Sequence, residues 1–130
     1  MAVVGNQNQL TLLLLLLCII TCVVIPPAQA VAQVITCDDL FRKLLACANF
    51  VMKGEGPIPK VCCGALKMVL ISSKTKQERQ SVCECTKARV AKFTPDQLKR
   101  ARDVPIQCQL PVFFRISPDV NCSQVSTRIN

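Results

Sequence analysis

Cysteine spacing constrains this chain more than any other feature of its sequence. Ten cysteines occur in 130 residues, and two of them, Cys18 and Cys22, lie in an apolar run near the N-terminus. The other eight are Cys37, Cys47, Cys62, Cys63, Cys83, Cys85, Cys108 and Cys122. So many cysteines in a short chain indicate an oxidising compartment and a small domain stabilised by disulfide bonds. Eight cysteines allow about a hundred pairings, and spacing alone does not choose among them.

The same sequence excludes several kinds of chemistry. Zinc binding is a poor alternative for the cysteines, because no paired C-x2-C knuckle is present. The chain has no histidine, which removes Ser/His and Cys/His catalysis as well as histidine-ligated zinc. The eight acidic residues form no evident catalytic pair. We therefore expect no enzymatic activity, no cofactor and no metal.

The N-terminus has the pattern of a secretory signal peptide. An almost unbroken apolar run over residues 10–25 is followed by Pro26-Pro27 and by overlapping small-x-small sites at residues 28–32. The run is shorter than the ~20 residues of a membrane-spanning helix, although an uncleaved anchor is the alternative. We predict a signal peptide over residues 1–32, cleaved after Ala30 or Ala32, and a single secreted domain over residues 33–130.

Local patterns predict four short helices in that domain. Thr36, Thr75 and Thr94 each precede an acidic residue or glutamine by three positions, as in a capping box. The first helix should run to Lys53-Gly54, the third through Val90 and the fourth to about residue 102. Another helix should open at Pro59 and end at residues 72–73.

The C-terminal part of the chain is predicted to be extended. From residue 104 onward, Pro105, Pro111 and Pro118 occur without any helical periodicity. The aliphatic, aromatic-poor composition indicates an aliphatic core.

The net charge of +8 is spread over all four predicted helices. One interpretation is a solvated surface. The other is attraction to anionic membrane surfaces, at roughly 1 kcal/mol per basic residue near the bilayer. Nucleic acid is excluded as a partner, because the chain has no aromatic stacking platform and no known binding motif.

The cysteine pattern resembles that of plant type 1 non-specific lipid-transfer proteins. The adjacent pair, the single-residue C-x-C and the interval lengths all match across the chain. Residues 75–79 (TKQER) fit the family's T-x-x-[DE]-R pentapeptide. Residues 113–117 (FFRIS) lie where the family has P-Y-x-I-S, with Phe113 in place of Pro and Phe114 in place of Tyr. The polar Glu84 inside C-x-C is typical of type 1.

The resemblance implies an all-α fold in which four short helices, stapled by four disulfides, surround an apolar tunnel, with an irregular C-terminal segment. It also implies a definite pairing: Cys37–Cys85, Cys47–Cys62, Cys63–Cys108 and Cys83–Cys122.

The function implied is that of an extracellular carrier that binds fatty acids, lysolipids or phospholipids and moves them between membranes or to the cell wall. The expected partners are these acyl lipids and anionic membrane surfaces, and the protein should be a monomer. By family position, the tunnel should be lined by Leu44, Leu66, Val69, Leu70, Val90, Val104, Val112, Phe114 and Ile116. Each of them could equally be an ordinary core residue.

Arg79 corresponds to the family arginine that holds the lipid head group. The alternative for Arg79 is an exposed ion pair with Glu78 or Glu84. Phe114 lacks the hydroxyl of the family tyrosine, and the neighbouring Arg115 is a candidate substitute. Thr86 and Arg89 are polar where many family members are apolar, so the lining face of the third helix is uncertain.

Two other functions remain open at this point. One is a cationic, membrane-active defence peptide. The other is a hydrolase inhibitor, since amylase and protease inhibitors share the wider eight-cysteine superfamily. The interval lengths and the two pentapeptides favour the carrier over the inhibitor.

Overall fold

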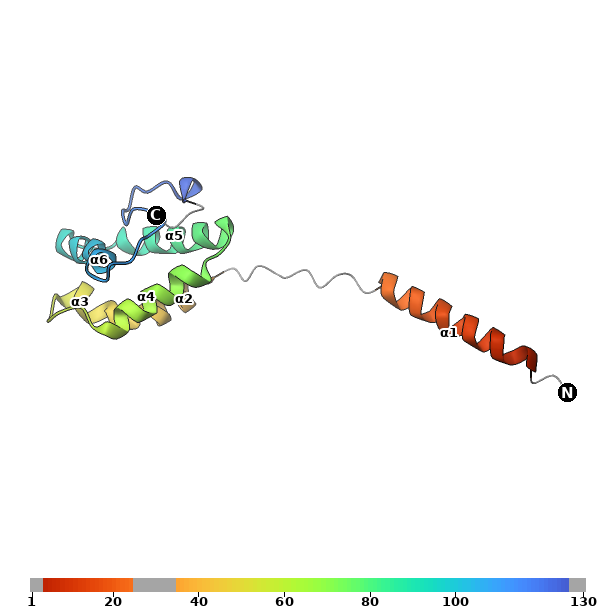
Figure 1. Cartoon of the computed structure of the whole chain (residues 1–130). Coiled ribbons are helices and arrows are strands. Elements are labelled where there is room, and N and C mark those ends of the chain that lie inside the picture. The colour runs from red at the N-terminus through yellow and green to blue at the C-terminus, as the bar shows by residue number, and fades with distance from the viewer. Residues whose placement is uncertain (1–3, 25–34, 127–130) are drawn as a thin grey trace. The chain divides into compact units, whose positions relative to one another are not determined.

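The computed structural model describes residues 4–24 and 35–126. The chain divides into two units, residues 1–32 and residues 33–130. In the first unit, helix α1 spans Val4–Val24 (Figure 1). Among the described helices, none is long and apolar enough to cross a membrane. The two predicted cleavage positions, after Ala30 and Ala32, lie outside the described residues.

The first predicted helix of the second unit is divided into three segments. These are α2 (Cys37–Lys43), the 3-10 turn η1 (Leu44–Cys47) and α3 (Ala48–Lys53). Thr36 caps α2 by accepting a hydrogen bond from the Asp39 backbone N–H at 3.3 Å. Gly54 ends α3 in the left-handed region at φ 69°, where glycine is favoured because it has no Cβ.

The next two helices follow the predicted limits closely. Helix α4 spans Lys60–Ser72 and starts directly after Pro59. Helix α5 spans Lys76–Val90 and begins with a complete capping box. In this box, Thr75 accepts from the Glu78 backbone N–H while the Glu78 carboxylate accepts from the Thr75 N–H.

The last helix corrects a prediction. Helix α6 spans Pro95–Gln107 and continues five residues beyond the expected end near residue 102, with Pro105 inside it. Proline lacks a backbone N–H, but Val104 and Pro105 are buried, and Cys108 is bonded to Cys63 of α4. Tertiary packing therefore compensates for the missing hydrogen bond. A Schellman turn ends the helix, with Gln109 at φ 55° and the Leu110 N–H bonded to the Pro105 carbonyl at 2.9 Å.

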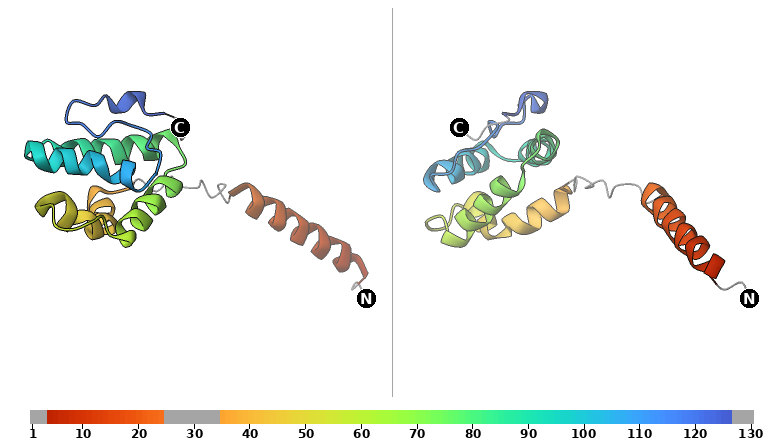
Figure 2. Two further views of the ribbon diagram at one scale, coloured as in Figure 1. Left: turned by 60° about the vertical axis from the view of Figure 1, so that its left-hand side comes forward. Right: turned by 45° about the vertical axis from the view of Figure 1, so that its right-hand side comes forward.

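Residues 109–126 form the irregular C-terminal segment, apart from the 3-10 turn η2 (Cys122–Gln124). This segment returns along α5, as Figures 1 and 2 show. The Ser126 N–H is bonded to the Phe113 carbonyl at 3.1 Å. Residues 35–126 contain helices and no strand, so the predicted all-α class is confirmed.

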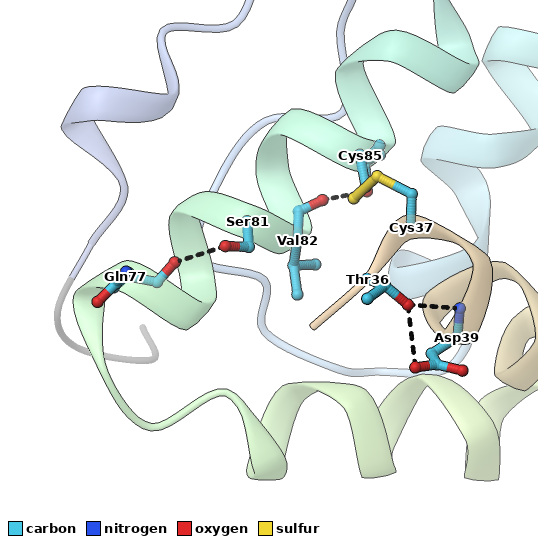
Figure 3. The surroundings of a disulfide bond; sticks show 8 residues. Thr36, Cys37, Asp39, Gln77, Ser81, Val82 and Cys85 are labelled. Carbon is cyan, nitrogen blue, oxygen red and sulfur yellow. Dashed lines mark hydrogen bonds between the residues drawn. A yellow bond between two sulfur atoms is a disulfide. The ribbon is translucent and has the colours of Figure 1, made fainter. Parts of the chain in front are cut away.

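Four disulfides connect these elements, in the pairs that the family resemblance implies. They join α2 to α5, η1 to α4, α4 to the end of α6, and α5 to η2. The pairs are Cys37–Cys85, Cys47–Cys62, Cys63–Cys108 and Cys83–Cys122. Figure 3 shows the first of them, beside the Thr36 cap of α2. Apart from α3, every helical segment of the described domain is thus tied covalently, within it or at its end, to another.

Candidate functional site

An apolar cavity of about 330 Å³ lies inside the domain. This volume is within the range of ~300–1,000 Å³ that is typical of small-molecule sites. All five helices that the structure describes in this domain contribute side chains to the cavity wall, as do η1 and the C-terminal segment. The wall is therefore completed only when the chain after α6 folds back onto the helices.

All nine apolar residues that were expected to line a tunnel lie in the wall of this cavity. Leu44 comes from η1, three residues come from α4, and α5 and α6 give one each. The C-terminal segment provides the remaining three. The full set is Leu44, Leu66, Val69, Leu70, Val90, Val104, Val112, Phe114 and Ile116.

The sequence analysis missed several other lining residues. Phe41, Leu45, Met52 and Phe93 also face the cavity. Phe41 and Leu45 lie beside the apolar stripe of the first predicted helix, and the 3-10 turn η1 lies between Phe41 and Met52. Because a 3-10 turn has three residues per turn instead of 3.6, the positions after it no longer follow the stripe of a continuous helix.

The cavity reaches from the core to the surface. Leu40, at one extreme, is only 1% exposed and belongs to the main hydrophobic cluster. Leu45, which lines the same cavity, is 65% exposed, and Met52 is also exposed. An apolar molecule could therefore enter from solvent and be buried along its length.

The lining face of α5 is polar in part, which resolves the uncertainty left by the sequence. Val82, Thr86 and Arg89 all face the cavity, at the spacing expected for one side of a helix. The Thr86 hydroxyl donates to the Val82 carbonyl at 2.8 Å, so its hydrogen-bonding capacity is used within the helix. Arg89 is exposed, and its guanidinium carbon lies 4.2 Å from the centre of the Phe41 ring.

The structure does not bring Arg79 together with the nine apolar residues. Arg79 is 6% exposed and is not part of the cavity wall. Its Nε donates to the Ser73 carbonyl at 2.9 Å and its Nη1 donates to the Ser126 carbonyl at 2.8 Å. The guanidinium also lies 5.2 Å from the centre of the Phe113 ring. These contacts join the end of α4 to the C-terminal segment.

The alternative of an exposed ion pair for Arg79 is wrong. The Glu78 carboxylate instead accepts the backbone N–H groups of Lys74 and Thr75, each at 2.8 Å. These hydrogen bonds, chiefly the one from Thr75, lower the pKa of Glu78 below its ordinary value. Glu78 is therefore committed to the helix cap while Arg79, one residue later, faces inward.

Arg115, the other candidate for the head group, does not line the cavity. Its guanidinium forms an exposed ion pair with Asp119 at 3.3 Å. The neighbouring residues Phe113 and Phe114 lie in different surroundings. Phe113 is buried in the core, whereas Phe114 faces the cavity, and their ring centres are 5.3 Å apart.

Comparison with known proteins gives a consistent result. The sequence model of the protease inhibitor/seed storage/LTP family matches residues 37–122. Non-specific lipid-transfer protein 2 of Solanum chilense is 34% identical over 110 residues, which cover 85% of this chain and 90% of that protein.

Two solved structures are similar in fold and carry lipids. Non-specific lipid transfer protein 1 of barley, in complex with a lysophosphatidylcholine, has a TM-score of 0.62 at 28% identity, covering 71% of this chain and 100% of the barley chain. The wheat non-specific transfer protein, in complex with two phospholipid molecules, has a TM-score of 0.61 at 27% identity, covering 70% of this chain and 100% of the wheat chain.

Proposed function

This chain belongs to the protease inhibitor/seed storage/LTP family, and from that premise we propose that it is a carrier of acyl lipids. It binds the hydrocarbon chain of a fatty acid, lysolipid or phospholipid in the apolar cavity. It then transfers the lipid between membranes or to the cell wall. The barley and wheat relatives with bound lipids support this assignment.

The observation that carries the proposal is the largely apolar wall of a cavity that reaches the surface. Each CH₂ group moved from water into such surroundings gains roughly 0.8 kcal/mol. A long acyl chain therefore gains on the order of 10 kcal/mol before the costs of association and chain ordering are subtracted. Because the gain depends on area, lipids with different head groups and similar chains should bind with comparable strength.

We further propose that the nine predicted apolar residues make the contacts with the acyl chain. On α4, Val69 and Leu70 belong to the main core cluster and Leu66 packs against it. Leu40 and Val82 of the same cluster also line the cavity, which supports this assignment. The three on the C-terminal segment are held in place by Arg79 and by the Cys83–Cys122 disulfide. The cavity can thus exist without a ligand, since covalent and charged contacts fix its outer wall.

The cavity favours the carrier over the two alternative functions. A hydrolase inhibitor binds its enzyme through a surface loop and needs no interior space. A membrane-active peptide likewise needs only charge and amphipathic surface, so disruption of membranes is an additional activity at most. We propose no enzymatic activity.

We propose that the protein acts outside the cell, as a monomer. Residues 1–32 would direct secretion, and residues 33–130 would be the lipid-transfer domain. Four disulfides support this location, because such bonds persist in oxidising compartments. The polar Glu84 between Cys83 and Cys85 supports type 1 within the family.

Native mass spectrometry tests the carrier function directly. The oxidised protein, purified as a secreting host produces it, is mixed with a pool of fatty acids and lysolipids. We expect complexes with one or two acyl lipids and similar retention of several species. If no member of the pool is retained, the protein shares the fold of the family but does not bind these lipids, and the carrier function is refuted.

A further inference from the structure

Arg89 is the one charged side chain in the described wall of the cavity. The other described lining residues are apolar, except Thr86 and the disulfide-bonded Cys47. A cation at the edge of an apolar cavity is costly to cover unless an anion compensates it. The position of Arg89 therefore matters for which lipids can fill the cavity completely.

The guanidinium of Arg89 is held by an aromatic ring instead of an acid. It lies over Phe41, itself a lining residue, with 4.2 Å between the guanidinium carbon and the ring centre. Stacking on the ring face leaves the N–H donors at the edge of the guanidinium plane free to point outward. The Arg89 side chain makes no ion pair or hydrogen bond with any residue that the structure describes.

Neighbouring positions on α5 supply no competing acid. Cys85 and Thr86 lie one helical turn before Arg89, and Lys92 and Phe93 follow just beyond the end of α5 at Val90. The last turn of a helix also favours a cation, because the free backbone carbonyls give it a partial negative charge. The cationic side chain is thus stabilised in place, with its donors unused.

We propose that Arg89 binds the anionic group of an acyl lipid whose chain fills the cavity, so that this carrier prefers lipids with a terminal carboxylate or phosphate. This inference rests on the proposed carrier function. Arg79, whose donors are bonded to the Ser73 and Ser126 carbonyls, is already committed to the fold. The forked guanidinium of Arg89 matches two oxygens of a carboxylate or phosphate, and Phe41 fixes its plane.

The test compares ligands that differ only in charge. Dodecanoate and its methyl ester are titrated into wild type, Arg89→Gln, Arg89→Lys and Lys92→Gln at neutral pH. Lys92→Gln is the matched control, because Lys92 is exposed near Arg89 but does not line the cavity. Lysophosphatidate has a terminal phosphate, whereas the phosphate of lysophosphatidylcholine bears a choline cation. This second pair tests whether Arg89 binds a terminal phosphate as it does a carboxylate.

We expect Arg89→Gln to weaken dodecanoate by about threefold to tenfold, a reduced value because the site is exposed. The methyl ester should change by less than about twofold, since its affinity rests on apolar area. Arg89→Lys should show an intermediate loss, because it keeps the charge but not the fork. Lys92→Gln should leave both ligands unchanged.

Two results would overturn the inference. The first is that wild type binds acid and ester with equal affinity and that Arg89→Gln changes neither. This result would be compatible with the carrier function but would show that Arg89 does not bind the head group. Equal losses of both ligands in Arg89→Gln would mean that the side chain only shapes the cavity. Binding of neither ligand by wild type would instead refute the carrier function itself.

Discussion

At the scale of single residues, the arginines of this protein differ in ways that their sequence context does not reveal. Arg79 bonds to the Ser73 and Ser126 carbonyls and lies over Phe113. Arg102 donates to the Ile116 carbonyl at 2.8 Å. These guanidinium groups replace backbone hydrogen bonds that an irregular segment cannot make with itself. Charge and stability are therefore coupled at the C-terminal segment.

We predict that Arg79→Ala lowers stability without altering head-group preference. The substitution leaves the carbonyl of Ser73, a fully buried residue, without its charged donor. A hydrogen bond from a charged group contributes about 1.5–3 kcal/mol, so the free energy of unfolding should fall by about that amount. Chemical denaturation measures it, and titration with dodecanoate and its methyl ester is the control. Selective loss of the acid would identify Arg79 as the head-group ligand after all.

A pair of glycine substitutions tests the end of α3. Gly54 has φ 69°, and a Cβ built there would lie 3.3 Å from Arg100 Cδ and Nη1. Gly54→Ala should therefore cost about 1–2 kcal/mol of unfolding free energy. Gly64, inside α4, has no atom within 4 Å of such a Cβ, so Gly64→Ala should instead stabilise by about 0.5–1 kcal/mol. Thermal melts that shift in the same direction for both would contradict this account.

At the scale of elements, sequence predicted where the helices begin, and among the helix ends it misplaced only that of α6. Thr36, Thr75 and Thr94 cap helices as expected, because a cap is a contact between residues three apart. The extension of α6 through Pro105 depends on burial and on the Cys63–Cys108 disulfide. Long-range contacts of this kind leave no trace in a local pattern.

The candidate site was predictable to the same degree. The nine apolar lining residues follow from the family pattern, whereas amphipathic helices predict only that apolar faces turn inward. The inward direction of Arg79 and the cavity position of Arg89 could not be predicted. Both lie on α5, a predominantly polar helix in which Val82 and Val90 are the only aliphatic residues that mark the buried face. Which side of α5 is covered depends on where α2 and the C-terminal segment pack.

The capping box of α5 should make stability depend on pH. Hydrogen bonds from the backbone of Thr75 and then Lys74 lower the pKa of Glu78 below 4.5, its ordinary value. The stabilising contribution of the ionised carboxylate is therefore complete above pH 4.5 and is lost as the pH falls through the lowered pKa of the folded protein. Glutamine keeps the acceptor but cannot ionise. The stability difference between wild type and Glu78→Gln should thus be largest at neutral pH and vanish in strong acid; a difference independent of pH would show that the charge contributes nothing.

At the scale of the whole molecule, exposed apolar residues on α4 accompany the basic surface. Val61, Met68 and Ile71 are all exposed on this helix, at positions that lie on one side of it. Lys60 and Lys67 lie among them in the sequence. An apolar stripe with flanking lysines is suited to the surface of an anionic membrane, where the stripe contacts acyl chains and the lysines contact phosphates.

This arrangement predicts lipid transfer without membrane rupture. The protein should move a fluorescent fatty acid between vesicles that contain anionic lipid, faster at low salt because screening weakens the attraction. Met68→Ser should slow this transfer several-fold, since it removes apolar contact with the bilayer, yet leave dodecanoate binding in solution unchanged, because Met68 does not line the cavity. Dye trapped in the same vesicles should stay inside throughout. Release of dye at the concentrations that support transfer would favour the defence-peptide function. Slowing of transfer together with weaker binding in solution would show that Met68 supports the cavity instead of the membrane contact.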